Sequence, residues 1–323
     1  MSKRHLAVAA IALAALSPLG AAADPAATPA PSAAPSAAPA ASPAASPAAA
    51  PAVATEFQVG AAHVFKSGAG ARAVVLLPGL ASGAYVFDGV VPELAQRYTV
   101  YAVTFAGFDG EPPVAAPYLD AFDKSIVDLI ARERLEKPVV VGHSLGGHIA
   151  LRLAEELGDS LGGVLVVDGL PVFPPPQPGE TPESRRAAAA RFRDGFTAAP
   201  LDQYTQYVRD FIGFLVIDPR NAALLATRSL RSDRATYGGA AYEYFLEDLR
   251  PDLKKISAPV ELVVPAPSDA AGPNVASAYK ALCPGIPKLD IVTIAPSRHF
   301  IMYDQPDKFR STLDAFLDGV AAP

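Results

Sequence analysis

The chain lacks tryptophan and contains a single cysteine, Cys283, among its 323 residues. One cysteine cannot form an intrachain disulfide, whatever the compartment. Blocks of lysine and arginine are also missing from the body of the chain, and the formal net charge is -6. Nucleic acid is therefore not an expected partner, because neutralising phosphates needs clustered cations. Hydrophobic residues make up 50% of the chain and charged residues 19%, which is typical of a globular domain with a sizeable core.

The apolar run near the N-terminus, Leu6–Leu16, is too short to cross a bilayer, which needs ~20 apolar residues. It follows the basic pair Lys3 and Arg4 and precedes Ala21-Ala22-Ala23. A basic start, a short apolar segment and an A-x-A site are the pattern of a cleavable signal peptide. We therefore expect residues 1–23 to be a signal peptide and the mature protein to be secreted or periplasmic. No cysteine comes directly after the predicted cleavage site, so a lipid anchor is not expected. The apolar run is too short for a stable membrane span, so none is expected either.

Proline, alanine and serine dominate the next segment, residues 24–54. From Pro31, proline recurs about every fourth residue in tetrads such as PSAA and PAAS. Proline at this spacing prevents a continuous helix, and these residue types provide no side chains for a core. The segment is therefore predicted to be a disordered spacer that carries no chemistry.

From about Thr55, short apolar runs alternate with helical patterns. The segment EFQVGAAHVFK favours an opening β-hairpin. Six later runs are predicted as buried strands: ARAVVLLPG, YTVYAVTFAG, KPVVVG, GGVLVVDG, APVELVVPAP and KLDIVTIAP. Short, nearly all-apolar strands separated by helices are typical of a parallel sheet covered on both faces. The predicted fold class is α/β, a mostly parallel, doubly wound sheet with residues 55–170 and 257–323 as its core.

The interval 171–256 breaks this alternation, because no convincing strand occurs in it. After the proline-rich stretch PVFPPPQPGETPE, its sequence indicates a series of helices. They are predicted around residues 184–196, 201–215, 220–230 and 237–249. A long helical insertion between two strands commonly acts as a lid. We therefore predict a helical cap inserted into the sheet protein.

The motif GHSLGG, residues 142–147, lies between a predicted strand and a predicted helix. A strand that runs through G-x-S-x-G into a helix is the nucleophile-elbow pattern. Turning from strand to helix on one residue strains the backbone of Ser144, and the two flanking glycines remove Cβ atoms that would collide with it. Free N–H groups at the helix N-terminus would stabilise negative charge beside the hydroxyl. We predict Ser144 as a nucleophile; the alternative is a glycine-rich turn with an N-cap serine.

A serine nucleophile needs a base, and the chain has five histidines. His5 lies in the predicted signal peptide, and His63 lies far upstream in the opening hairpin. His143 adjoins the serine as a packing residue, and His148 would face along the following helix. His299, in the segment SRHFIMYDQPDKF, follows the last predicted strand directly. Because α/β sheets place their sites beyond the carboxyl ends of parallel strands, His299 is the predicted base.

The base in turn needs an acid to orient it. Chain order in this type of site is nucleophile, acid, base, so the acid should lie between Ser144 and His299. Asp269, in a loop a few residues after the strand APVELVVPAP, is the preferred candidate. Asp168, immediately after GGVLVV, is the alternative acid, or else a residue of the pocket floor.

An oxyanion hole requires two aligned hydrogen-bond donors. The backbone N–H of Leu145, the residue after the predicted nucleophile, is one candidate. The turn PGLASG that follows the strand VVLL should supply the other, and Leu80 N–H is the predicted donor. The alternative for this segment is an ordinary glycine- and proline-containing turn.

These motifs together resemble the α/β-hydrolase superfamily, in its capped, serine-dependent, esterase-like branch. The resemblance covers about residues 74–320 and includes GHSLGG, LLPGLASGAYVF, FAGFDGEPP, DLRPDLKKISAPV and SRHFIMYDQPDKF. It implies Ser144, Asp269 and His299 as a catalytic triad, with the two oxyanion donors named above. The sequence departs from the family's pattern in two places. Pro78-Gly79 stands where His-Gly is frequent, and the acid loop reads APSD where a glycine commonly comes first.

The resemblance implies an activity, the hydrolysis of carboxylic esters of small apolar or acyl substrates through an acyl-enzyme. The aromatic residues concentrated in 171–256 favour an apolar pocket for an acyl chain or an aromatic ester. No metal or cofactor is expected, and the expected partner is a small-molecule ester. The same triad would serve a thioesterase, a lactonase, a C–C hydrolase or a cofactor-free perhydrolase. A ligand-binding protein that keeps the fold without catalysis is a further alternative, and the oligomeric state stays open.

Overall fold

A computed structural model describes residues 55–320, so the predicted signal peptide, 1–23, and spacer, 24–54, lie outside the described residues. Eight strands of this part form one sheet in the order β1-β2-β4-β3-β5-β6-β7-β8. Their bounds are β1 Thr55–Val59, β2 Ala62–Ser67, β3 Ala73–Leu77, β4 Thr99–Phe105, β5 Val139–His143, β6 Gly163–Val167, β7 Val260–Pro265 and β8 Leu289–Ile294. Every stretch predicted as a strand overlaps one of them, and the predicted opening hairpin overlaps β1 and β2.

The sheet is mostly parallel, as predicted. Strands β1 and β2 form the opening antiparallel hairpin, and β2 also pairs antiparallel with β4. All remaining neighbours, from β4 through β3 and β5 to β8, pair in parallel. The carboxyl ends of the parallel strands therefore meet at one edge of the sheet, where a site is expected.

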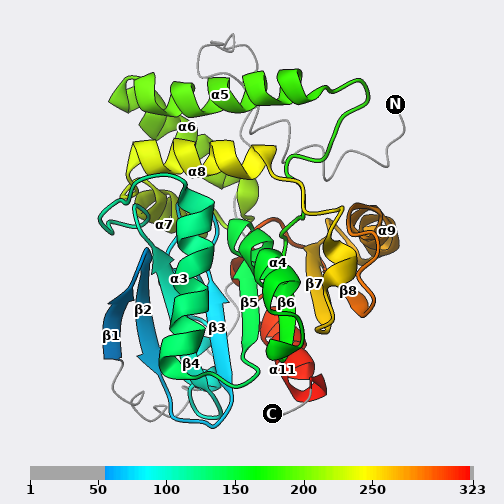
Figure 1. The fold of residues 1–323 in the computed structure, drawn as a ribbon. Helices are drawn as coiled ribbons and strands as arrows, with labels where there is room; N and C mark the ends of the chain where they lie inside the picture. The colour runs from blue at the N-terminus through cyan, green and yellow to red at the C-terminus, as the bar shows by residue number, and fades with distance from the viewer. Residues whose placement is uncertain (1–54, 321–323) are drawn as a thin grey trace, which may run out of the picture.

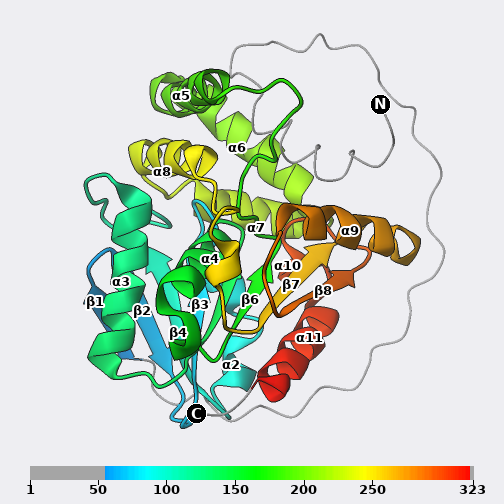
Figure 2. The ribbon, with the colours of Figure 1, turned by 45° about the vertical axis from the view of Figure 1, so that its right-hand side comes forward.

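Both faces of the sheet are covered, which explains why its strands are almost continuously apolar. On β5, Val140 packs into the cluster that includes residues of α3 and α4, whereas Val139 and Val141 pack into the cluster that includes α11. Figures 1 and 2 show α3 and α4 on one face and α11 on the other. The covering helices are α2 Val91–Leu94, α3 Tyr118–Glu133, α4 Leu145–Leu157, α9 Gly272–Leu282, α10 Ile301–Asp304 and α11 Pro306–Gly319. Short 3-10 helices are η2 Ala84–Phe87, η3 Gly158–Ser160, η4 Leu253–Lys255 and η5 Asp269–Ala271.

Four helices lie between β6 and β7 and stand together above one edge of the sheet, at the top of Figure 1. We call them the lid helices: α5 Pro182–Ala198, α6 Leu201–Leu215, α7 Pro219–Ser229 and α8 Arg234–Leu246. Their sequence explains where three of them begin. Side chains of Thr181, Asp218 and Asp233 accept hydrogen bonds from backbone N–H groups in the first turns of α5, α7 and α8. Such caps satisfy donors that the helix itself cannot pair.

The last lid helix ends earlier than expected, at Leu246 and not at Leu249. The residues that follow α8 become extended, because Asp248 forms an isolated antiparallel bridge with Val172. Leu249 N–H also donates to the carbonyl oxygen of Pro171 at 2.9 Å. The two ends of the lid segment are therefore tied to each other beside the sheet. Among residues 55–320, no helix combines the length and apolar character that a membrane crossing requires.

Candidate active site

Ser144 lies at the turn between β5 and α4 in a strained backbone conformation, with φ 55° and ψ -117°. A non-glycine residue rarely adopts a positive φ, and such strain concentrates at functional sites. Ser144 is also the one residue from position 138 to 151 that is not fully buried. The turn therefore brings the serine out of a segment that is otherwise enclosed by the core.

The two motif glycines are required by space. A Cβ atom on Gly142 would lie 2.1 Å from the carbonyl oxygen of Gly146, and one on Gly146 would lie 2.2 Å from the carbonyl oxygen of Leu77. Real side chains do not tolerate such contacts with backbone. The close approach of the β5–α4 turn to the end of β3 is thus possible only with glycine at both positions. This geometry supports the elbow predicted from the motif over an ordinary capped turn.

His299 lies in the loop between β8 and α10, and its Nδ1–H donates to Oδ2 of Asp168 at 2.6 Å. Asp168 follows β6 directly, is buried, and has a positive φ of 45°. The structure therefore places the alternative acid, Asp168, and not the preferred candidate, Asp269, in hydrogen-bond contact with His299. Asp269 is exposed and begins η5.

Strand register explains this correction. Val167, the last residue of β6, pairs with His143, the last residue of β5. The residues that follow them, Asp168 and Ser144, therefore leave the sheet side by side, and Ser144 N–H donates to the carbonyl oxygen of Val167 at 2.9 Å. Asp269 instead comes four residues after the end of β7, at the start of η5, and it is exposed to solvent.

The other described histidines have structural partners. His143 is buried, and its Nε2–H donates to the backbone oxygen of His299 at 3.1 Å. Burial, and next the neighbouring His299 ring, lower the pKa of His143 well below its usual range, so this ring is neutral. His148 hydrogen-bonds the backbone oxygen of Leu170 at 2.9 Å and Oε2 of Glu247 at 2.8 Å. His63, in the hairpin, hydrogen-bonds Oε1 of Glu111 through its Nδ1 at 2.7 Å.

Two backbone donors predicted for an oxyanion hole are available. Leu145 is the first residue of α4, so its N–H has no partner within the helix. Leu80 follows β3 in a turn closed by the hydrogen bond from Ser82 N–H to Gly79 O at 3.1 Å. Within residues 55–320, neither N–H donates to another protein group. A Cβ on Gly79 would lie 3.0 Å from Cβ of Ser144, so this turn passes directly beside the serine.

Ser144, His299 and Asp168 line one cavity between the sheet edge and the lid helices. The other lining side chains are almost all apolar or aromatic. They include Leu80, Leu170, Phe173, Phe192, Phe211, Ile212, Leu215, Tyr237, Tyr244, Phe245, Tyr279 and Phe300. In the described part of the chain, no lysine or arginine lines this cavity, and no group of three or more His, Cys, Asp or Glu side chains could hold a metal ion.

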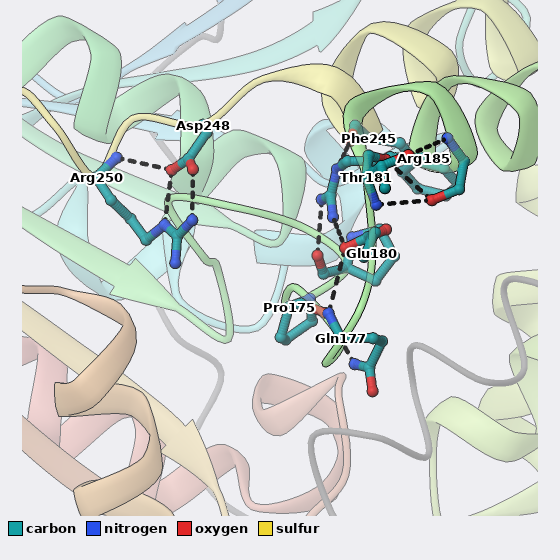
Figure 3. A network of polar contacts seen from close by, with 10 residues as sticks. Pro175, Gln177, Glu180, Thr181, Arg185, Phe245, Asp248 and Arg250 are labelled. Carbon is teal, nitrogen blue, oxygen red and sulfur yellow. Dashed lines mark hydrogen bonds and ion pairs between the residues drawn. The ribbon is translucent and has the colours of Figure 1, made fainter.

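Two arginines fix the walls of the cavity. Arg185 on α5 donates to the carbonyl oxygens of Phe245 at 2.5 Å and Pro174 at 2.7 Å, and it pairs with Glu180 at 3.0 Å (Figure 3). This contact set joins α5 to the end of α8, which carries cavity side chains. Arg298, beside the predicted base, donates to carbonyl oxygens at the end of α6, including that of Val216 at 3.0 Å. A cation at a helix C-terminus is stabilising, so the His299 loop and the lid support each other.

Comparison with known proteins identifies the family to which the sequence and the fold are similar. The sequence profile of the Alpha/beta hydrolase family matches residues 74–312. The pimeloyl-[acyl-carrier protein] methyl ester esterase of Nitrosomonas europaea is 26% identical over 249 residues, which cover 75% of this chain and 94% of that protein. A thermophilic esterase from Thermogutta terrifontis superposes with a TM-score of 0.67 at 19% identity, covering 84% of this chain and all of that one.

A shorter similarity joins the chain to an uncharacterized protein of Mycobacterium tuberculosis, with 28% identity over 109 residues. That match covers 33% of this chain and 32% of the Mycobacterium protein, so the chain matches about a third of the length of that relative.

Proposed function

We propose that this chain, which belongs to the Alpha/beta hydrolase family, hydrolyses carboxylic esters through an acyl-enzyme formed on Ser144. The observation that carries the proposal is the 2.6 Å hydrogen bond from His299 Nδ1–H to Asp168, made in the wall of the same cavity that Ser144 lines. A neutral imidazole that donates from Nδ1 has its lone pair on Nε2. That is the tautomer that a general base for a serine hydroxyl requires.

In the proposed reaction, Ser144 Oγ attacks the ester carbonyl while His299 accepts its proton. The Asp168 carboxylate stabilises the imidazolium that forms, and the N–H groups of Leu80 and Leu145 donate to the carbonyl oxygen as it becomes negative. The alcohol leaves with the proton from His299, and His299 then activates a water that hydrolyses the acyl-enzyme. Losing one oxyanion donor in such a site costs about 3–4 kcal/mol of transition-state stabilisation.

The lining of the cavity indicates which esters suit it. Its side chains supply aromatic and aliphatic surface, and the one carboxylate, Asp168, is already hydrogen-bonded. A substrate with its own carboxylate would enter without a cationic partner and would be desolvated at a cost. We therefore propose uncharged acyl or aromatic esters as substrates. The N. europaea relative is named for an esterase of methyl esters, which supports ester chemistry at this site.

Two comparisons test the proposal. Ser144→Ala should abolish turnover of p-nitrophenyl butyrate while the melting temperature stays close to that of the parent protein. For the parent, p-nitrophenyl butyrate should be hydrolysed with kcat/KM at least roughly tenfold above that of p-nitrophenyl succinate, which adds a charge to a similar chain. Activity retained in Ser144→Ala would exclude the serine mechanism. A folded protein that binds esters and hydrolyses none would indicate the ligand-binding alternative.

We also propose that the mature protein is exported, on the basis of the signal-peptide pattern in residues 1–23. N-terminal sequencing of the protein isolated from its native source should then begin near Asp24. A mature protein that begins at Met1 would contradict export by this route.

A further inference from the structure

The buried carboxylate that holds His299 has a second side-chain partner. Oδ2 of Asp168 accepts from His299, and Oδ1 accepts from the hydroxyl of Tyr279 on α9. The Asp168 side chain is only 2% exposed, and Tyr279 is buried as well. Tyr279 also lines the cavity. Both oxygens of the carboxylate are therefore occupied by protein donors.

We propose that Tyr279 is a positioning residue, which acts on His299 through Asp168 by fixing the orientation of the carboxylate and sharing its negative charge. The inference rests on the proposed function, because it assigns Tyr279 to the machinery of the same site. It also explains how an acid placed directly after β6 is supported. The segment after β7, where Asp269 was expected to serve, instead leads into α9 and delivers the tyrosine.

Chemistry fixes the direction of the hydrogen bond. Burial, and secondly the charge of Asp168, raise the pKa of Tyr279 far above its ordinary value, so the phenol keeps its proton and donates it. Two donors on one carboxylate restrict its rotation more than His299 alone could. Hydrogen bonds to a charged acceptor are the strong ones in a dry site.

The hydrogen bond from Tyr279 affects the protonation of His299 through the charge of Asp168. A carboxylate beside a neutral imidazole carries an uncompensated charge, whereas beside an imidazolium its charge is partly neutralised. The Tyr279 hydrogen bond therefore stabilises the state with neutral His299 more than the protonated state. Removing the phenol hydroxyl should favour protonated His299 and extend its protonation to higher pH. The other titratable groups packed here are His143 on β5, Tyr244 on α8 and Cys283 after α9, and Tyr279→Phe replaces none of them.

The test is Tyr279→Phe, with Tyr237→Phe as the matched control. Tyr237 is another buried tyrosine of the same cavity, but it makes no hydrogen bond to Asp168. The titration of the His299 ring is followed by NMR of labelled imidazoles in the folded, ligand-free protein. We expect its midpoint to rise by roughly half a pH unit or more in Tyr279→Phe and to stay in place in Tyr237→Phe. The His63 signal provides an internal reference in each sample.

Kinetics provide a second measurement, which would stay unchanged if Tyr279 only supported the fold. The acid limb of kcat/KM for p-nitrophenyl butyrate should shift to higher pH by the same amount in Tyr279→Phe. KM at the pH optimum should change less than kcat. An unchanged His299 midpoint in a folded Tyr279→Phe protein would overturn the inference. Because the NMR titration needs no turnover, a parent protein that hydrolyses no ester would refute the proposed function and still leave this measurement decisive for Tyr279.

Discussion

Replacing Asp168 by asparagine should nearly abolish turnover, because it reverses the hydrogen bond that sets the His299 tautomer. An asparagine at this position has the size of the aspartate. Its amide oxygen can still accept from Tyr279, which turns the NH2 group toward His299 Nδ1. A donor facing Nδ1 requires Nδ1 to be the acceptor, so the proton moves to Nε2. The lone pair needed to deprotonate Ser144 is then lost.

The size of the effect follows from the loss of the base. In a comparable Ser-His-Asp site the aspartate-to-asparagine change lowers kcat by about 10⁴-fold, equivalent to roughly 5 kcal/mol in the barrier. We expect a loss of this order for Asp168→Asn with p-nitrophenyl butyrate at pH 7.5. Asp269→Asn is the matched control, since Asp269 is exposed and does not bond His299. Its kcat should stay within about twofold of the parent, as expected for an exposed residue outside the site.

Stopped-flow measurement separates acylation from deacylation and shows which step each variant affects. Both steps use His299, so Asp168→Asn should slow both and should leave no burst of p-nitrophenol. Circular dichroism and melting temperature confirm that the variants are folded. The reasoning would be refuted if Asp168→Asn kept more than a tenth of the parent kcat, or if Asp269→Asn lost as much activity as Asp168→Asn.

Two further predictions concern packing and pH. Gly79→Ala should lower kcat roughly tenfold or more without unfolding the protein. The added Cβ would lie 3.0 Å from Ser144 Cβ and from His143 Nδ1, so these neighbours must shift. An unchanged kcat together with the parent melting temperature would show that Ser144 is not displaced. Asp123→Asn should stabilise the protein above neutral pH, because burial, partly opposed by Arg152, raises the pKa of Asp123 to about 7. A carboxyl whose pKa is raised in the folded state increasingly destabilises the protein as the pH rises from ~4 toward 7. In urea unfolding, Asp123→Asn should therefore raise the free energy of unfolding by up to ~4 kcal/mol at pH 8, and this gain should vanish near pH 4. An equal gain in the free energy of unfolding at pH 4 and pH 8 would show that the raised pKa of Asp123 is not its cause.

Local sequence pattern was sufficient for the strands and the elbow. Each strand is a short apolar run, and the sheet confirms all six predicted parallel strands as well as the opening hairpin. The turn at Ser144 was predictable because its two glycines are demanded by contacts within the motif and with the end of β3. His299 is predicted as the base by excluding the other histidines. The structure gives three of those histidines hydrogen-bond partners: Glu111 for His63, the backbone oxygen of His299 for His143, and the backbone oxygen of Leu170 for His148.

The acid could not be assigned in the same way, because it depends on register and on the start of a distant helix. Asp168 and Asp269 both follow strands, and only the pairing of β6 with β5 brings the former beside the site. Tyr279 lies 111 positions from Asp168 in the chain, and no local pattern connects the two. One signal was present: Asp168 comes directly after a buried strand that precedes the lid, whereas Ser268 and Asp269 have the composition of a helix start.

The central claim is that Ser144 is a nucleophile activated by His299. Its most direct test is labelling of the folded protein with a fluorophosphonate, followed by intact mass and peptide mapping. We predict one adduct per chain, on Ser144, with labelling abolished in Ser144→Ala and strongly slowed in Asp168→Asn. A folded parent protein that takes up no label, or takes it up at a residue other than Ser144, would contradict the account.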